Sequence, residues 1–477
     1  MDQRPHILLI SADELRKDAL GCYGELAIGT PHLDALSASG TQFEAAYANS
    51  PLCLPSRCTI LTGLYPHNSR AYSNFRPCPL DPRLPNIYNV LKSGGYRTAH
   101  VGKCHYAPEG ERAGAGGAVD GGEEKAFYMS LGLDHLVLQN GKMGSLSVYD
   151  DYSRELDAAG YLAAYRDAAE ARKKNGRLFA FPGPDELHPD AWVGRKAVEY
   201  IETQPAAEPQ FLWVSFSGPH YPFDAPASYY ERVDAAKLKR LVFREGEFDG
   251  SKIQSPAYHG GGEQMPLAEG KNSAPGGACK NFDDDYWQRL RVAYLANVAL
   301  IDDWVGRIVA AAKEAYGENL MVIFTADHGE MGGNHHLWGK NGCAYEDVLN
   351  VPLLVKFPGR KAHESSGARV MLMDLMPTCA AVAGVEAPPV DGRDLRQSMQ
   401  DGGYPFVLSE CDGMMVIADG KFKYIQYQQK GREMCEAYDL VRDPHEFDNV
   451  AHDRGYLGEV NRMRGLLTGL FMRDFLK

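Results

Sequence analysis

A cysteine and an arginine stand four residues apart in a run that could do chemistry on an anion. Cys53, Pro55 and Arg57 belong to the run CLPSR, and Thr62 and Gly63 close it. Proline is tolerated in the first turn of a helix, so we expect a helix to begin here with the cysteine at its positive end. Backbone N–H groups and a guanidinium one turn away would lie beside the thiol. The run therefore predicts a site for a tetrahedral oxyanion.

Acidic, basic and histidine side chains that could act in catalysis also follow four of the five strands with the clearest sequence patterns. The strands are expected at His6–Ile10, Thr98–Val101, Phe211–Phe216, Leu320–Thr325 and Pro352–Val355. The side chains that follow the first four are Asp13 and Glu14, Lys103 and His105, His220, and Asp327 and His328. Ligands of open α/β sheets bind beyond the carboxyl ends of the strands, so we expect these side chains to meet in one crevice. A single histidine after a strand is more often a hydrogen-bonded loop residue, but here the pattern recurs four times.

Carboxylates supply the hard ligands of this group. Asp13, Glu14 and Asp327 offer oxygen atoms, with Cys53 as the one thiol expected nearby. Oxygen ligands suit Ca²⁺ or Mg²⁺, and Mn²⁺ is an alternative. Such an ion would hold a nucleophile and neutralise charge that develops on a transferred group.

The run at residues 53–63 resembles the C-x-P-S-R-x4-T-G signature of the sulfatase family and matches it at every fixed position. Residues 95–105 (GYRTAHVGKCH) are similar to the second signature of that family, G-Y-x-T-x-x-x-G-K-x-H. Gly218–His220 and Gly339–Lys340 are similar to its third and fourth active-site segments, and residues 437–444 to its C-terminal subdomain. The resemblance covers essentially the whole chain.

The resemblance implies a nucleophile, a metal site and a maturation step. In sulfatases a maturation enzyme oxidises the signature cysteine to formylglycine, so a formylglycine hydrate at Cys53 is the expected nucleophile, activated by the metal and by Asp327. Asp13, Glu14, Asp327 and His328 are the expected ligands of Ca²⁺, together with the modified residue. Glu14 stands where the family more often has Asp or Gln, and its longer side chain changes the reach of the carboxylate.

The resemblance also implies roles for the remaining site residues. Arg57, Lys103 and Lys340 are expected to hold the sulfuryl oxygens of the substrate, and Arg57 is also expected to stabilise the hydrate. His220 is expected to protonate the leaving group, helped by Lys340, and His105 to take the proton whose removal releases sulfate. Asn74 is a candidate substrate contact, with turn capping as an equal alternative. His335 and His336 lie near Lys340 in the sequence and are expected to support the site without contacting the substrate or the metal.

Three functions remain open on the sequence. The first is hydrolysis of a small sulfate ester, such as a sulfated sugar, an aryl sulfate or an alkyl sulfate. The second is phosphonate monoester or phosphodiester hydrolysis, since related enzymes share the nucleophile, metal and fold. Lys103 and His105 favour sulfate, because the related phosphonate hydrolases tend to carry uncharged hydroxyl residues there. The third is a non-enzymatic metal-binding relative in which Cys53 is never oxidised.

The alternation of strands and helices predicts an α/β fold, with a large mixed, mostly parallel sheet between helices. Helices are expected at Pro31–Ser39, Ile87–Lys92, Ala191–Thr203, Asp284–Ala315 and Leu372–Ala383. Two stretches without periodicity, Pro108–Pro189 and Phe243–Phe282, are expected to be irregular active-site walls or lids, with disordered linkers as the alternative. We expect a catalytic domain at residues 1–384 and a C-terminal subdomain at 385–477, with a short antiparallel sheet and a closing helix.

Composition restricts the partners. The 477 residues carry a net charge of −13, which argues against nucleic acid and against an anionic membrane as the main partner. No signal peptide and no apolar run of about 20 residues is visible, so a cytoplasmic protein is expected, although a leader removed from the expressed chain stays open. The ten cysteines lack paired metal spacing and are expected to be mostly buried thiols. The sequence is compatible with a homo-oligomer and does not determine the oligomeric state.

Overall fold

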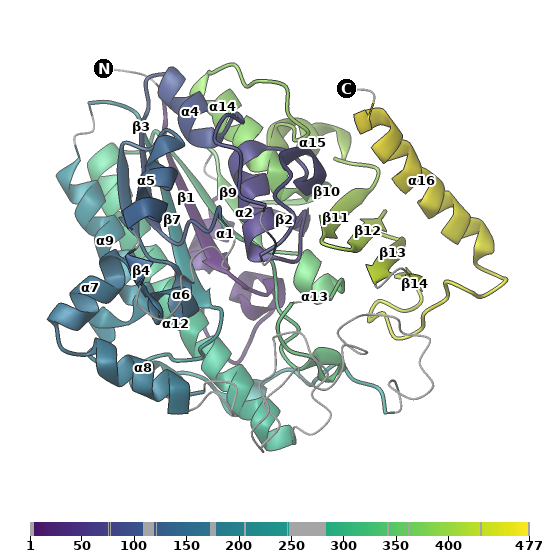
Figure 1. Cartoon of the computed structure of the whole chain (residues 1–477), viewed down its shortest axis with the longest axis horizontal. Helices are drawn as coiled ribbons and strands as arrows, with labels where there is room; N and C mark the ends of the chain where they lie inside the picture. Colours follow the sequence, from purple (N-terminus) through teal and green to yellow (C-terminus); the bar gives the residue numbers. More distant parts are fainter. Residues whose placement is uncertain are drawn as a thin grey trace.

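A sheet of eight strands forms the centre of the computed structural model (Figure 1). The structure describes residues 4–74, 76, 78–107, 119–120, 122–171, 178–204, 207–245, 247, 283–340, 343–360, 362–429 and 432–475. The strand order is β10-β2-β9-β8-β1-β7-β3-β5. The strands are β1 (His6–Asp13), β2 (Thr41–Tyr47), β3 (Arg97–Gly102), β5 (His135–Leu138), β7 (Gln210–Pro219), β8 (Leu320–Ala326), β9 (Leu353–Lys356) and β10 (Glu364–Met371).

The sheet is parallel except at β9, which pairs antiparallel with both β2 and β8. This confirms the predicted fold class. β1 lies at the centre, between β7 and β8, and every one of its residues is buried. A strand covered on both faces reads as a continuous apolar run, which explains why it was visible in the sequence. The register of β1 against β7 shifts between Ser11 and Asp13, where the strand enters the site.

Two layers of helices cover the sheet. One layer contains α1 (Pro31–Ala38), α9 (Pro189–Thr203) and the long α12 (Asp284–Tyr316), which contacts both of the others. The other contains α2 (Cys53–Thr62), α4 (Ile87–Ser93) and α14 (Leu375–Ala383), which also contact one another. The five predicted helices are confirmed to within a few residues. No helix among the described residues is long and apolar enough to cross a membrane.

The remaining elements are short and connect the sheet to the helices. They are α3 (Pro66–Ser69), β4 (Val119–Asp120), α5 (Gly122–Ser130), α6 (Gly141–Ser145), β6 (Val148–Tyr149), α7 (Asp151–Ala158), α8 (Leu162–Ala171), α10 (Ala227–Tyr230), α13 (Glu346–Leu349) and α15 (Leu395–Asp401). Several of them lie in the stretch Pro108–Pro189, so the prediction of an irregular segment there was wrong. Short helices such as α7 and α8, which bury only three residues each, leave little periodicity in a sequence. Most of the second stretch, residues 248–282, lies outside the described residues.

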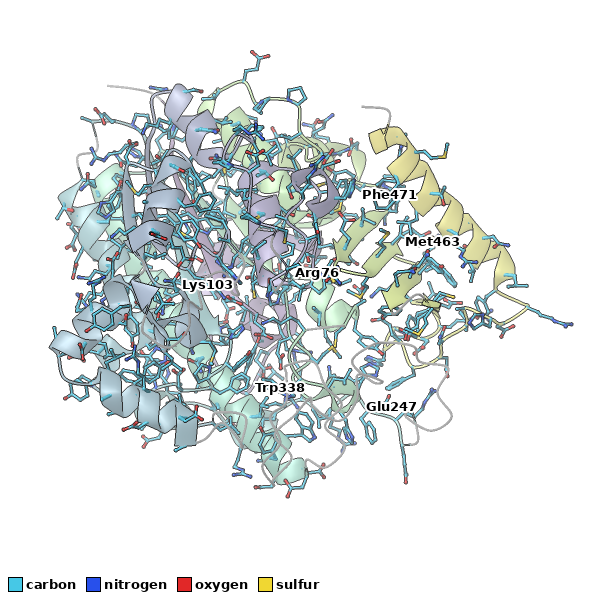
Figure 2. All side chains as sticks on the ribbon, in the orientation of Figure 1. Arg76, Lys103, Glu247, Trp338, Met463 and Phe471 are labelled. Carbon is cyan, nitrogen blue, oxygen red and sulfur yellow. The ribbon has the colours of Figure 1, made fainter. Side chains whose placement is uncertain are left out.

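A second, antiparallel sheet follows in the C-terminal part of the chain. Its strands are β11 (Val407–Cys411), β12 (Met414–Ala418), β13 (Phe422–Gln429) and β14 (Arg432–Asp439), in that order. The closing helix α16 (Leu457–Phe475) packs Met463 and Phe471 toward this sheet (Figure 2). The same apolar cluster includes Tyr47 and Tyr345 of the larger part. The division at residue 384 stays a prediction.

Candidate active site

Helix α2 presents Cys53 at its N-terminus. Leu52, in extended conformation, is the N-cap, and Cys53 is the first helical residue. The side-chain oxygen of Asn74 accepts a hydrogen bond from the backbone N–H of Leu54 at 2.9 Å and so satisfies one of the free donors of the first turn. Asn74 thus supports the start of α2 from 20 residues away rather than capping its own turn, and its contact with substrate stays a prediction. Gly63 ends the helix with a φ of +72°, a conformation that favours glycine.

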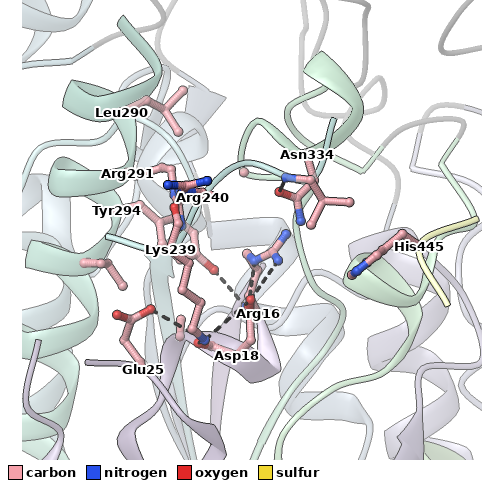
Figure 3. A pocket seen from close by; sticks show the side chains of 14 residues that line it. Arg16, Asp18, Glu25, Lys239, Arg240, Leu290, Arg291, Tyr294, Asn334 and His445 are labelled. Atoms are coloured by element: carbon pink, nitrogen blue, oxygen red, sulfur yellow. Dashed lines mark hydrogen bonds and ion pairs between the residues drawn. The ribbon is translucent and has the colours of Figure 1, made fainter. Parts of the chain in front are cut away.

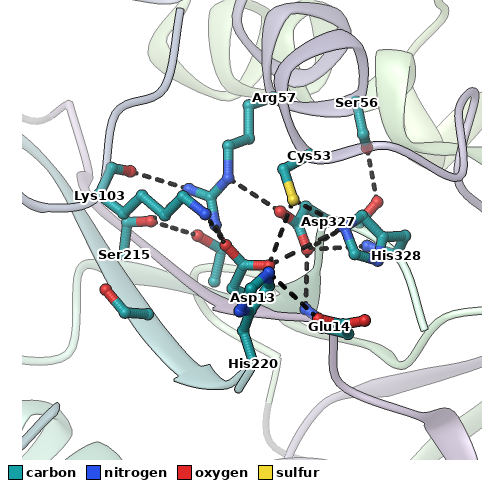
Figure 4. A network of polar contacts seen from close by, with 12 residues as sticks. Asp13, Glu14, Cys53, Ser56, Arg57, Lys103, Ser215, His220, Asp327 and His328 are labelled. Carbon is teal, nitrogen blue, oxygen red and sulfur yellow. Dashed lines mark hydrogen bonds and ion pairs between the residues drawn. The ribbon is translucent and has the colours of Figure 1, made fainter. Parts of the chain in front are cut away.

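The predicted strand ends bring their side chains to this helix terminus (Figure 4). One ligand atom from each of Asp13, Cys53, Asp327 and His328 lies within 4.8 Å of the other three, and all four residues are buried. The Cys53 Sγ is 3.1 Å from His328 Nε2 and 3.6 Å from Asp13 Oδ1. Residues separated by up to 315 positions in the chain thus form one cluster, as the strand-end pattern predicted.

Arg57 holds this cluster together from within. Its guanidinium donates to Asp327 Oδ2 at 2.8 Å and to Asp13 Oδ2 at 3.2 Å. It also donates to the backbone oxygen of Lys103 at 2.8 Å and to the Ser215 hydroxyl at 2.6 Å. The side chain is fully buried, and these contacts use most of its donors. The geometry therefore differs from the expected role of Arg57, because the guanidinium orients two carboxylates rather than pointing toward a substrate.

Two lysines add positive charge to the site. The Lys103 Nζ is 2.5 Å from Asp13 Oδ2, and the Lys340 Nζ is 3.0 Å from Glu14 Oε2. Burial works against the ammonium of Lys340, but the neighbouring Cys53 and Glu14 raise its pKa well above the ordinary value. Burial also raises the pKa of Asp13, but Lys103 and Arg57 outweigh it and hold that pKa well below the ordinary value. Asp13 is therefore ionised, as a metal ligand has to be.

Glu14 lies apart from the four-atom cluster. Its Oε2 faces Lys340 and also His220 Nε2, at 3.3 Å, while its buried Oε1 has no hydrogen-bond partner among the described residues. Burial raises the pKa of Glu14 to about 8, despite the lowering effect of Lys340. The residue belongs to a second group of metal-capable side chains with Asp13 and His220. A carboxyl oxygen without a partner at such depth is what a further ligand would satisfy.

The two histidines expected to move protons are both at the site. His220 follows β7, donates from Nδ1 to the Tyr221 backbone oxygen at 2.6 Å and turns Nε2 toward Glu14. Burial, assisted by the charge of Lys340, lowers the pKa of His220 well below its ordinary value, so the imidazole is neutral. His105 follows β3, is buried and has a φ of +57°, which is uncommon for a residue other than glycine.

The donor atoms fit a divalent cation. His328 Nδ1 donates to the Gly329 backbone oxygen at 2.9 Å, which leaves the lone pair of Nε2 facing Asp13 and Asp327. Two carboxylates, this imidazole nitrogen and the unpartnered oxygen of Glu14 are ligands of the right chemistry. By contrast, burial and the charge of Asp13 raise the pKa of the Cys53 thiol to about 12. The unmodified cysteine is thus a protonated thiol and a poor nucleophile.

Several site residues were not found by reasoning from the sequence. Ser215 on β7 supports Arg57, and the Tyr294 hydroxyl on α12 donates to the Glu14 backbone oxygen at 2.7 Å. Asn140 follows β5 and is buried, and neither polar atom of its amide has a partner within the described part of the chain. The next residue, Gly141, packs against the Lys103 side chain. The strand-end rule would have found Asn140, but β5 itself had not been predicted.

His335 and His336 lie outside the cluster. His335 stacks on Tyr345 and has its Nδ1 3.2 Å from a carboxylate oxygen of Glu247. His336 stacks on Phe243. Both residues therefore belong to the loop packing near Trp338 and Glu247, the lower region labelled in Figure 2.

Comparison with known proteins agrees with the geometry. The family model "Sulfatase" matches residues 5–385, and the model "N-sulphoglucosamine sulphohydrolase, C-terminal" matches residues 333–471. An arylsulfatase of Clostridium perfringens is 27% identical over 97% of this chain and 94% of its own. The multifunctional alkaline phosphatase superfamily protein PehA of Trinickia caryophylli is 28% identical over 96% and 93%. The phosphonate monoester hydrolase of Agrobacterium radiobacter has the same fold, with a TM-score of 0.80, 24% identity and coverage of 98% and 96%.

Sulfatases generally use a metal ion and a formylglycine, and this chain has both a candidate metal cluster and the signature cysteine. The chain belongs to the sulfatase family and is a sulfuric ester hydrolase.

Proposed function

We propose that the protein hydrolyses the sulfate ester of a small molecule, such as a sulfated sugar, an aryl sulfate or an alkyl sulfate, after Cys53 has been oxidised to formylglycine. The observation that carries this proposal is the position of Cys53. It lies at a helix N-terminus, 3.1 Å from His328 and 3.6 Å from Asp13, yet burial keeps its thiol protonated. An oxygen nucleophile formed from this residue would act where the thiol itself cannot.

We assign the metal site to Asp13, Asp327, His328 and the modified residue 53, with Glu14 as a further ligand through Oε1. Ca²⁺ is the proposed ion, and Mg²⁺ and Mn²⁺ are the alternatives. When bound, the ion would lower the pKa of the hydrate and neutralise charge on the sulfuryl group. The contacts of Arg57 support a role as the residue that orients Asp13 and Asp327.

The lysines and histidines would handle the sulfuryl oxygens and the protons. Lys103 and Lys340 are the cations available to bind the sulfuryl group, since Arg57 is already satisfied by protein groups. His220 is neutral in the free chain. A bound anion would raise its pKa, so that the protonated imidazole could donate its proton to the leaving-group oxygen. His105 would remove the proton that accompanies release of sulfate. Asn74 is kept as a substrate contact next to Leu54.

The remaining parts of the proposal concern partners and location. A formylglycine-generating enzyme has to act on Cys53, which is buried in the folded chain, so we expect it to act before folding is complete. We place the enzyme in the cytoplasm, acting on a small anionic ester and without nucleic acid or membrane as a partner. We also propose that residues 1–384 form the catalytic domain and residues 385–477 a C-terminal subdomain, with the oligomeric state open.

Phosphonate monoester hydrolysis is the second candidate. The likeness in fold to the Agrobacterium enzyme favours it, but Lys103 and His105 place charge and a titratable ring where, on the family resemblance, the phosphonate hydrolases tend to carry hydroxyl residues. The ratio of turnover of an aryl sulfate to that of an aryl phosphonate decides between the two. We expect the sulfate to be the better substrate.

The experiment that tests the proposal combines mass spectrometry with kinetics. Peptide mass spectrometry of protein co-expressed with a maturation enzyme should find an aldehyde at residue 53. Replacing the nucleophile, Cys53→Ala, should reduce aryl sulfate turnover by roughly 10⁴-fold or more. Cys58→Ala, in the same helix but outside the cluster, is the matched control and should keep the activity of its folded fraction. Full activity of Cys53→Ala would contradict the mechanism.

A further inference from the structure

A cavity of about 230 Å³ lies next to the active site but contains none of its assigned residues (Figure 3). It is enclosed by the segment after β1, the first turns of α12, residues 239–242 and residues 332–334. Its volume equals roughly seven or eight water molecules at about 30 Å³ each, enough for a small ion with part of its hydration or a ligand of a few heavy atoms.

The charges around the cavity do not balance. Arg16, Lys239, Arg240 and Arg291 line it, together with the two carboxylates Asp18 and Glu25. Basic side chains of the lining therefore outnumber acidic ones by two, and by one when Asp347, the ion-pair partner of Arg16, is included. Low-dielectric walls concentrate the field of such an excess, so that a small anion would be attracted into the space.

The carboxylates are already used by two of the cations. Arg16 pairs with Asp18 at 2.8 Å and with Asp347 at 2.8 Å, and it also donates to two backbone oxygens. The Lys239 Nζ lies 3.8 Å from oxygens of both Asp18 and Glu25, as the dashed lines of Figure 3 indicate. These contacts account for the acidic groups of the lining.

Arg291 is one of the two cations of the lining that remain. Its Nη1 donates to the Lys239 backbone oxygen, and within the described residues it forms no ion pair. Burial and the nearby charge of Arg16 lower the pKa of Arg291, and the charges of Asp18, Glu25 and Asp347 offset this effect only in part. Arg240, exposed at the edge of the cavity, likewise forms no ion pair with the described residues. A planar guanidinium with unmatched donors is the group that binds oxyanions in bidentate fashion.

We propose that this cavity is a second ligand site, which binds a small oxyanion between Arg291 and Arg240. Carboxylate, phosphate and sulfate groups share the required chemistry. Tyr294 separates the cavity from the catalytic cluster, since its ring lines the cavity while its hydroxyl bonds to the backbone of Glu14 and of Arg16. An anion bound at Arg291 is therefore not a substrate in position for reaction. The apolar side chains of Val242, Leu290 and Leu295 also allow a short hydrocarbon part on the ligand.

The test is calorimetric titration of the full chain with inorganic phosphate, sulfate and acetate in separate arms. The variant Lys340→Met serves as the background, because it weakens anion binding in the active site without touching the cavity. In this background we expect one remaining site for at least one of the anions. Adding Arg291→Met should weaken that binding by tenfold or more, whereas Arg291→Lys should weaken it less.

The matched control is Arg307→Met, which removes an exposed arginine from the same helix and should leave binding unchanged. Circular dichroism establishes that each variant is folded, and if Arg291→Met is not, Arg240→Met tests the same site from its outer edge. The proposal is overturned if Lys340→Met binds none of the three anions, or if its binding survives Arg291→Met unchanged. Because the readout is binding without turnover, the outcome is independent of whether the protein hydrolyses sulfate esters.

Discussion

Two buried clusters of charge lie at the same end of the large sheet and are built differently. In the first, the Lys142 cluster, the Lys142 Nζ is 2.6 Å from Asp224, 2.9 Å from the Asn297 side-chain oxygen and 3.3 Å from the Pro222 backbone oxygen, with Asp190 at 3.5 Å. Burial works against the Asp224 carboxylate, but the charge of Lys142 holds its pKa well below the ordinary value. Lys142 and Asp224 form a close ion pair inside the protein, and Asp190 adds a second carboxylate. Asp190 Oδ1 accepts from the backbone N–H groups of Ser217 and Gly218, while its Oδ2 has no hydrogen-bond partner among the described residues.

The active-site cluster is the opposite case. Lys103 and Arg57 pair with the carboxylates of Asp13 and Asp327, and Lys340 faces Glu14. Burial leaves Glu14 with a pKa of about 8 and with one oxygen that has no partner among the described residues. Ion pairs that are complete within the protein position the backbone, whereas an excess of cations with unsatisfied oxygens waits for a ligand. Burial alone does not distinguish a structural cluster from a site. The difference here is the balance of charge, because three cations surround Asp13, Asp327 and Glu14, whereas a single lysine pairs with Asp224 and Asp190.

The largest effect on stability is expected from Lys142→Met. This change leaves two carboxylates buried without their cation, and breaking a buried pair in this way costs about 3–5 kcal/mol in the free energy of unfolding. Denaturant titration measures the loss. Lys196→Met, which removes a lysine bridging Glu155 and Glu199 on the surface of α9, is the control and should cost less than about 1 kcal/mol. Equal losses in the two variants would mean that the cluster is not a structural unit.

Lys340→Met should have the opposite effect, with a large loss of activity and a small loss of stability. The loss of a cation that binds the sulfuryl group is expected to reduce kcat/KM for an aryl sulfate by roughly 10²–10³, which is about 3–4 kcal/mol of transition-state binding. Stability should change by no more than about 1 kcal/mol, because Glu14 can keep its proton once its partner is gone. Steady-state kinetics and denaturant titration on the same protein give both numbers. A destabilisation as large as that of Lys142→Met would erase the distinction between the clusters.

The sequence revealed these two clusters unequally, for a physical reason. Asp13 and Asp327 directly follow apolar runs buried on both faces, so the strand ends were visible from a handful of residues. The partners of Lys142 lie 82 and 155 residues away, and no local pattern records such pairing. Lys142 itself lies after β5, in the stretch whose short helices left little periodicity in the sequence. The role of Arg57 was also out of reach, because its sequence motif fixes its position but not which carboxylates it contacts.

The loss of folding stability on removal of the metal should also distinguish the active-site cluster from the Lys142 cluster. A cation present at a hundred times its Kd stabilises the folded state by about 3 kcal/mol, and a chelator should remove that amount from the wild type. In Asp327→Asn, which lacks a proposed ligand, the chelator should change the unfolding midpoint much less. Lys142→Met should keep the full response, because its cluster takes no part in metal binding. A chelator effect of the same size in Asp327→Asn would exclude Asp327 from the metal site.

The smallest effect concerns a third cluster, in which one lysine is shared by two carboxyl groups. Lys423, on β13, lies 2.8 Å from both Glu346 and Glu446, all three in the contact between the small sheet and the larger part. Burial and the neighbouring Glu346 raise the pKa of Glu446 to about 7, against the lowering effect of Lys423, whereas the pKa of Glu346 is lowered. The cluster is complete for one carboxylate but not for two.

The pH dependence of stability follows from that imbalance. A carboxyl whose pKa is higher in the folded than in the unfolded state binds more protons when folded, so its stabilising contribution is full below pH 4.5 and is lost as the pH rises through 7. Glu446→Gln abolishes this titration. Between pH 5 and pH 8 the wild type should therefore lose about 1–2 kcal/mol relative to Glu446→Gln, less than an isolated group would give because the proton is shared with Glu346. Glu459→Gln on α16 is the control and should track the wild type. If the difference between Glu446→Gln and the wild type stays constant with pH, Glu446 is ionised throughout, and one lysine is enough to complete a cluster of two carboxylates.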